Sequence, residues 1–285
     1  MPTLRKRRSL KSRIMSVATL MVLALSAQTS NAVTPQASPL DPNASWETRR
    51  VVLLPLERFV TGDNGIFRRS DSAHSMSGVE GIWTRRLEEV FSRGLGIELI
   101  ESQAVPRVLM QRDSYREVLS LSRERFSLGV EAFKMLRIPD AISHLERALQ
   151  LFEDGLLDFV HPGQRADIAM YRGITLTEQD DLASALHAFR DMWLFDPSRR
   201  FKRGYYPMAI EGVIQAAYDE VFGQPTIGRL RYPVERLAVL AEHVRADIWL
   251  IPTLVGTEDA PSLEVIGLDA SGGDTLFELS IPLVN

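Results

Sequence analysis

Apolar residues in the first third of the chain follow strand-like runs separated by one helical pattern. Residues 51–56 (VVLLPL) form a continuous apolar run of strand length, and residues 97–100 (IELI) form a second one. Between them, apolar residues recur three and four positions apart, as on one face of a helix: Val79, Ile82, Trp83, Leu87, Val90 and Phe91. Residues 49–101 are therefore predicted to form a strand, a helix and a strand.

The last fifty residues carry similar patterns in another order. A helix is predicted over 234–244, followed by strands at 247–251 and 263–269. The final stretch, 277–283, alternates apolar and polar residues, which is typical of a strand with one wet side. Pro282 in this strand predicts an edge position, because proline has no backbone N–H for a sheet ladder.

Each of these flanks is too small to form a stable sheet alone. Joined, they predict an α+β protein with a discontinuous small α/β sandwich of about five strands and two helices. Its first half covers 48–112 and its second half covers 234–285. A helical insert at 114–222 and a linker at 223–233 lie between the halves. Two separate small domains are the alternative.

The helical insert contains a repeated pattern of small and large residues. Glycine, alanine, leucine and alanine in the first half correspond to glycine, alanine, phenylalanine and methionine 44 positions later: Gly129, Ala141, Leu145 and Ala148, then Gly173, Ala185, Phe189 and Met192. Small residues are expected where the two helices of a unit cross, because larger side chains there would push the helices apart. A third, capping helix is predicted over 208–222.

This layout resembles that of tetratricopeptide repeats, which have a period of about 34 residues. The surplus residues fall at 154–163, between the two units. The resemblance implies that a protein or peptide partner binds the surface lined by the first helix of each unit. It places the partner contacts at Arg123, Phe126, Val130, Phe133, Lys134, Asp167, Met170, Ile174, Thr177 and Glu178. A generic pair of helical hairpins is the alternative.

The flanks resemble the N-terminal α/β domain of the TolB family of envelope proteins. The segments that carry this resemblance are VVLLPL at 51–56 and AEHVRADIWLIPTLVG at 241–256. The resemblance covers about a third of the chain. The β-propeller that follows this domain in TolB has no counterpart here.

The composition of the N-terminus differs from that of the rest of the chain. Residues 1–32 contain a basic block, then an apolar stretch over 14–27, then small residues ending at Ala32. This is the order of a secretory signal peptide, with cleavage expected after Ala32. A membrane anchor is the alternative, but the apolar run is shorter than a spanning helix needs. Residues 33–47 are rich in proline and serine and are predicted to be a flexible linker.

Charge and cysteine content narrow the classes of function. Six of the 33 Lys and Arg residues, and none of the 37 Asp and Glu residues, lie in 1–32, so the remainder has a net charge of −10. An acidic body argues against general binding to nucleic acid. The chain has no cysteine, which excludes disulfides, thiolate metal sites and thiol nucleophiles. We expect no cofactor or metal, and a periplasmic or secreted location.

The sequence contains no catalytic motif. It has no phosphate-binding glycine loop, no nucleophile elbow and no histidine pair at metal-ligand spacing. The chain is therefore predicted not to be an enzyme. An enzyme whose catalytic residues are dispersed along the sequence stays an alternative.

One basic and aromatic segment follows the second unit at 199–206 (RRFKRGYY). Its cations predict contact with an anionic group: Arg199, Arg200, Lys202 and Arg203. A solvated loop with packed aromatics is the alternative. The leading prediction is thus an exported, non-catalytic adaptor of the cell envelope. The second is a glycan- or lipid-binding accessory subunit that uses this segment.

Overall fold

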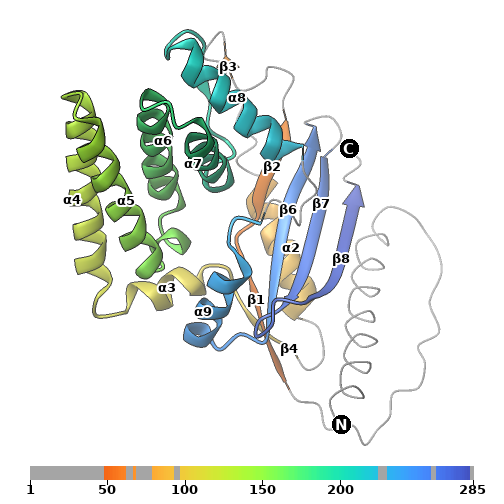
Figure 1. The fold of residues 1–285 in the computed structure, drawn as a ribbon. Helices are drawn as coiled ribbons and strands as arrows, with labels where there is room; N and C mark the ends of the chain where they lie inside the picture. Colours follow the sequence, from red (N-terminus) through yellow and green to blue (C-terminus); the bar gives the residue numbers. More distant parts are fainter. Residues whose placement is uncertain are drawn as a thin grey trace, which may run out of the picture.

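A helical region stands beside a mixed β-sheet in the computed structural model of the protein (Figure 1). The structure describes residues 48–61, 67–68, 79–92, 97–223, 230–257 and 261–282. The predicted signal peptide and the linker at 33–47 lie outside these residues. None of the described helices is long and apolar enough to cross a membrane.

The sheet combines strands from both ends of the chain. Its strands are β1 (Arg49–Leu53), β2 (Glu57–Thr61), β4 (Ile97–Ile100), β6 (Ile248–Thr257), β7 (Pro261–Asp269) and β8 (Thr275–Pro282). The order is β4-β1-β6-β7-β8, with β2 also paired to β6. The strands β1, β2, β4 and β6 pair in parallel, whereas β7 and β8 add antiparallel. The predicted discontinuous α+β architecture is confirmed, and β8 is an edge strand as Pro282 indicated.

The apolar run at 51–56 forms the end of one strand and a break, where one strand was expected. Both β1 and β2 pair with β6, β1 opposite 248–250 and β2 opposite 253–257. Between them, Leu54 N still donates to Leu250 O at 2.9 Å, but Pro55 has no N–H to continue the ladder. The sequence pattern did not reveal β2 as a strand of its own.

Both faces of the sheet are covered. Helix α2 (Val79–Ser92) packs on one face, where Leu87 and Phe91 contact the odd-numbered residues of β1, Val51 and Leu53. The neighbouring residue Val52 points into the larger core on the other face. That core also takes up α9 (Val234–Val244) and the helical region. A continuous apolar run is what a strand buried on both faces requires.

The helical region is a series of antiparallel hairpins. Its elements are α3 (Ala104–Met110), α4 (Tyr115–Lys134), α5 (Ile138–Asp154), η1 (Leu157–Phe159), α6 (Pro162–Glu178), α7 (Leu182–Phe195) and α8 (Met208–Phe222). Each helix from α4 to α8 packs against the next one. The capping helix lies at the predicted residues. Helix α3 and the short pair β3 (Phe67–Arg68) and β5 (Phe201–Lys202) were not expected.

The expected close approach of helices is present at both glycines. A Cβ atom on Gly129 would lie 2.8 Å from Leu145 Cγ in α5. A Cβ atom on Gly173 would lie 2.9 Å from the Phe189 ring in α7. The two contacts occur at equivalent positions, 16 residues apart in each unit, so α4–α5 and α6–α7 are built on the same crossing. These pairs are called the first and second units below.

Candidate partner-binding groove

The first unit presents a partly exposed apolar strip to the second unit. Phe126, Val130 and Phe133 lie along one side of α4, and each is half-buried. The rings of Phe126 and Phe133 approach Tyr171 of α6 edge-on, with centroids 5.6 and 6.5 Å away. The structure thus brings two predicted partner contacts, Phe126 and Phe133, against a tyrosine that was not predicted.

Two predicted cations lie beside this apolar strip. Arg123 and Lys134 are exposed on α4. The Nε atom of Arg123 donates to Gln164 Oε1 of α6 at 3.2 Å, which directs the guanidinium toward α6. The α4 side of the groove therefore combines aromatic surface with positive charge.

The second unit is more deeply buried than predicted. Ile174 is 4% exposed and Thr177 is 9% exposed, and the Thr177 hydroxyl donates to Gly173 O at 2.8 Å. Neither side chain reaches an open surface, so these two predicted partner contacts are part of the core instead. Glu178 stays exposed, at the end of α6. The next helix, α8, packs against α6 and α7, whereas among the described elements α4 has smaller contacts with the short helix α3.

Arg199 belongs to the predicted anion-binding segment, and it contacts Asp167 and Met170, which were predicted as partner contacts. Its guanidinium donates to Asp167 Oδ1 at 2.6 Å and to Asp196 Oδ2 at 3.0 Å. A third guanidinium nitrogen lies 3.1 Å from Met170 Sδ. Arg199 is therefore occupied by carboxylates of its own chain, and it neutralises Asp167 on the α6 side of the groove.

The remainder of the basic segment divides between internal and exposed residues. Arg200 donates to the carbonyl oxygens of Pro197 and Arg199, at 3.3 and 2.8 Å. Lys202 and Arg203 are exposed. Burial raises the pKa of Tyr206, and the nearby hydroxyls of Tyr205 and Tyr171 raise it further. Through Arg199, which contacts Asp167 and Met170, this segment lies beside α6.

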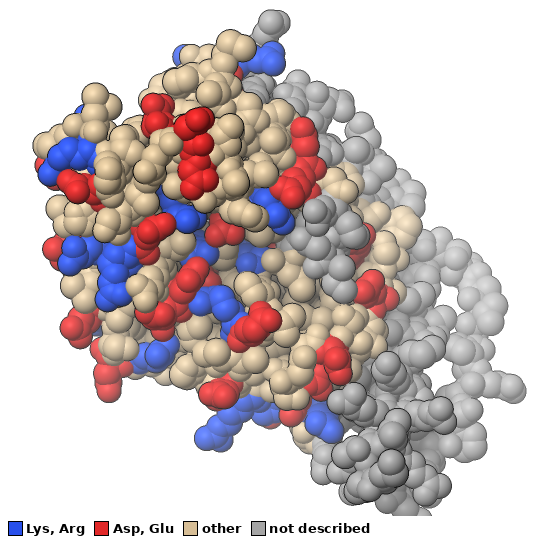
Figure 2. Space-filling view, viewed as in Figure 1, with Lys and Arg blue, Asp and Glu red and all other residues tan. Residues whose placement is uncertain are grey.

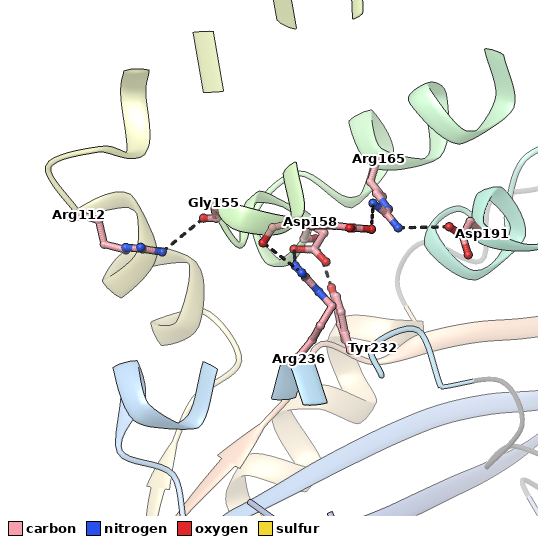
Figure 3. Close-up of polar contacts among 8 residues, drawn as sticks. Arg112, Gly155, Asp158, Arg165, Asp191, Tyr232 and Arg236 are labelled. Carbon is pink, nitrogen blue, oxygen red and sulfur yellow. Dashed lines mark hydrogen bonds and ion pairs between the residues drawn. The ribbon is translucent and has the colours of Figure 1, made fainter. Parts of the chain in front are cut away.

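The ten-residue insertion between the units anchors the helical region to α9 and to Tyr232, which lies just before that helix (Figure 3). Asp158 is 1% exposed and accepts from Arg236 at 2.6 Å through its Oδ1 atom. The Tyr232 hydroxyl donates to Asp158 O at 3.3 Å, and Arg236 also donates to Glu153 O at 3.0 Å. The departure from a regular repeat therefore has a structural use at this junction.

Arg165 ties both units together close to the same junction. Its guanidinium donates to Glu153 Oε1 of α5 at 2.7 Å and to Asp191 Oδ2 of α7 at 3.2 Å (Figure 3). The cation also lies over the Phe195 ring, 5.1 Å from its centroid. Burial raises the pKa of Asp191, and Arg165 opposes that rise. Figure 2 shows acidic and basic side chains interspersed over the middle of the face that is viewed in Figure 1.

A third buried ion pair links the sheet to α7. Arg231 Nε lies 3.1 Å from Glu57 Oε1 of β2 and donates to Leu194 O at 2.9 Å. Burial raises the pKa of Glu57 from its usual 4.5 to about 7, although the positive charge of Arg231 lowers it. These groups hold the second unit against the sheet.

In the part of the chain that the structure describes, no group of three or more His, Cys, Asp or Glu residues could hold a metal ion. The Tyr115 hydroxyl lies 2.6 Å from His161 Nε2. Burial lowers the pKa of His161, and the positive charge of Arg123 lowers it further. This pair connects the start of α4 to the start of α6.

Sequence reasoning missed several residues that shape the groove and its support. Tyr171 lies 44 positions after Ser127, so the repeat offset makes it the equivalent of an exposed residue on α4. Arg165 follows Leu121 by the same offset but differs in chemistry. The pair of Glu57 and Arg231 has no such signal, because only the folded sheet brings these residues together.

Comparisons with known proteins give little further information. No protein-family model matches the chain. No curated protein matches it either. Among solved structures, the chain is similar to the C-terminal domain of LpoB from Salmonella enterica, with 15% identity over 29% of this chain and 74% of that one. The TM-score is 0.18, which is too low to support a statement about fold or function.

Proposed function

We propose that the protein is an exported, non-catalytic adaptor of the cell envelope that binds a protein or peptide partner in the groove between α4 and α6. The observation that carries this proposal is the half-exposed strip of Phe126, Val130 and Phe133 beside Tyr171. Aromatic side chains offer large contact area at low entropic cost, which favours their use in interfaces. The tetratricopeptide-like layout of the two units agrees with this use of the groove.

Export is the second part of the proposal. It rests on the signal-peptide pattern of residues 1–32 and on the resemblance of the flanks to the TolB N-terminal domain. A non-catalytic role is favoured because the buried ion pairs of the described residues are engaged in holding elements together. Such pairs perturb pKa values without implying catalysis.

A capture experiment tests the adaptor role. Residues 33–285 are immobilised and exposed to envelope extract beside the variant Lys134→Glu with Glu178→Lys, which exchanges the charges of the two exposed groove positions. The matched control is Arg147→Glu, an exposed position on α5 outside the groove. We expect one protein to be retained by the wild type and the control and lost by the groove variant. Equal capture by all three forms would contradict the proposal.

A glycan- or lipid-binding accessory role is the second candidate. It is favoured by Lys202, Arg203 and Tyr205, which are exposed together beyond the second unit, with Tyr205 71% exposed. Such binding would depend strongly on salt and would be lost in Lys202→Glu with Arg203→Glu. The same double variant should leave capture of a groove partner unchanged. Retention of envelope glycolipid that this variant abolishes would favour the second candidate.

A further inference from the structure

Charges on α4 are sorted into two lines along the helix. At 3.6 residues per turn, one line next to the apolar strip carries exposed cations: Arg116, Arg123 and Lys134. A line further round the helix, beyond these cations, carries exposed carboxylates spaced seven residues apart: Glu117, Glu124 and Glu131. The surface that borders the apolar strip is therefore positive, although the exported chain as a whole is negative.

The facing side of the groove does not cancel this positive charge. On α6, the repeat offset makes Asp167 the equivalent of Arg123 and Glu178 the equivalent of Lys134. Asp167 is neutralised by Arg199 at 2.6 Å, so Glu178 is the carboxylate that stays exposed among these positions. The groove thus favours a ligand with negative charge on the side that meets α4.

The apolar strip leads to an unusual residue at the tip of the first unit. Leu136 is 81% exposed and has a φ of 57°, in the left-handed region. Its backbone N–H donates to Phe133 O at 2.9 Å, which places it directly after the strip. The equivalent residue of the second unit is Asp180, with a φ of 65°, and aspartate tolerates this conformation far better than leucine does.

A large apolar side chain that is both strained and exposed needs an explanation beyond folding. Met135 beside it is also 57% exposed. An asparagine or aspartate at 136 would relieve strain and remove exposed apolar area at once. Leu136 therefore has the features of a contact residue at the end of the groove.

We propose that the α4 surface formed by the apolar strip, the adjacent cations and Leu136 binds an acidic peptide segment of a partner protein. This inference rests on the proposed adaptor function and specifies the chemistry of the partner. Apolar side chains of the segment contact Phe126, Phe133 and Leu136, and its carboxylates face Arg123 and Lys134. The acidic line further round α4 repels the same segment, which fixes the side of α4 on which it lies.

Two synthetic peptides test the proposal against residues 33–285. They share leucine and tyrosine at the same positions and differ only in having glutamate or lysine at the polar positions. Affinity is measured by fluorescence anisotropy at low and at moderate salt. We expect the acidic peptide to bind at least about tenfold more tightly than the basic one, and to weaken as salt is raised. Lys134→Glu should reverse the preference, whereas Arg147→Glu should not.

Leu136→Asn separates a contact role from a structural role. We expect the midpoint of thermal unfolding to rise by about 2–4 °C, because asparagine fits the left-handed conformation. Affinity for the acidic peptide should fall at least about fivefold in the same variant, as for loss of an apolar contact. Asp180→Asn, the matched control in the second unit, should leave both values unchanged. Unaltered affinity in Leu136→Asn would remove Leu136 from the site.

The remaining outcomes separate this inference from the adaptor function. Equal or tighter binding of the basic peptide would overturn the acidic partner while leaving groove binding in place. Absence of binding by both peptides would also overturn it, and the capture experiment would then decide the adaptor function alone. Retention on phosphatidylglycerol vesicles that is lost in Lys134→Glu would assign the cations to a membrane surface and overturn the proposal.

Discussion

The two units of the helical region share one crossing geometry and differ in what surrounds them. Gly129 and Gly173 approach their partner helices equally closely, at 2.8 and 2.9 Å from a built Cβ atom. Yet Val130 and Phe133 are half-buried, whereas the equivalent Ile174 and Thr177 are core residues. In the described part of the chain, the second unit lies between α5 and α8 and is tied to the sheet, whereas α4 packs mainly against α5 and makes smaller contacts with α3 and α6.

This difference shows that a repeat template fixes internal packing but not exposure. Equivalent positions have equivalent directions on their helices, so both units were expected to contribute equally to the groove. Neighbouring elements then decide which of these positions stay accessible. In this protein the second unit is part of the core, and the first unit keeps its equivalent side chains partly accessible.

The largest contrast is expected at positions 121 and 165, which are equivalent in the two units. Arg165→Ala removes the cation between Glu153 and Asp191 and its contact with Phe195, and should lower the free energy of unfolding by about 3 kcal/mol. Leu121→Ala should cost less than about 1 kcal/mol, because Leu121 is 40% exposed. Urea unfolding measures both values. Equal losses in the free energy of unfolding would show that these positions contribute equally to stability in the two units.

The pH dependence of stability tests how Glu57 contributes to the attachment of the second unit to the sheet. The pKa of Glu57 is about 7 in the folded protein and 4.5 ordinarily. Between these pH values the folded protein keeps a proton that the unfolded chain has lost. The free energy of unfolding therefore falls as pH rises from about 4.5 to about 7. Glu57→Gln removes this loss. The variant should match the wild type at the acidic end and exceed it by up to about 3 kcal/mol above pH 7.

Denaturant unfolding of both proteins across this range provides the measurement. Asp158 and Asp191, whose pKa values burial also raises, are present in both proteins and cancel in the difference. A variant that is less stable than the wild type above pH 7 would show that the attraction between Glu57 and Arg231 outweighs the burial of the carboxylate.

Alanine substitutions at the two glycines compare the packing of the two helix crossings. Gly173→Ala should destabilise by about 2 kcal/mol, because the new methyl group meets the stiff Phe189 ring in a closed core. Gly129→Ala should cost about 1 kcal/mol less, since the flexible Leu145 side chain can change its rotamer. Thermal unfolding of the two single variants checks the order. The reverse order would place the more rigid crossing in the first unit.

The smallest effect is expected at the hairpin tips. Asp180→Leu copies the first-unit tip into the second unit and should cost about 1 kcal/mol, because leucine is strained at a φ of 65°. Calorimetry of this variant beside Leu136→Asn gives the two directions of the same exchange. If both substitutions leave the midpoint unchanged, the left-handed conformation carries no strain at either tip.

Much of the fold could be predicted from periodicity and small residues. The helix at 234–244, the capping helix at 208–222 and both glycine crossings lie where the sequence placed them. The break at Pro55 was missed, because an apolar run looks the same whether one strand or two use it. A strand as short as β5 also leaves no periodic signal.

The groove was predicted less well than the fold, for a physical reason. The positions on the first helix of each unit follow from the repeat, and those of the first unit are half-buried or exposed. The burial of Ile174 depends on the main core of the folded protein, and the ion pair of Arg199 depends on Asp167, 32 residues earlier. Contacts of this kind are set by the packing of whole elements, which local patterns do not encode.

The interleaved sheet has a consequence for how the chain folds. The N–H of Arg50 donates to Asp247 across 197 residues, so the central strand pair cannot form until the chain has closed a very long loop. Closing such a loop in a disordered chain is entropically unfavourable and slow. The helical hairpins between the strands rely on local contacts and can form first. Once packed, they hold the strand ends near one another, so the insert acts as the template on which the sheet assembles.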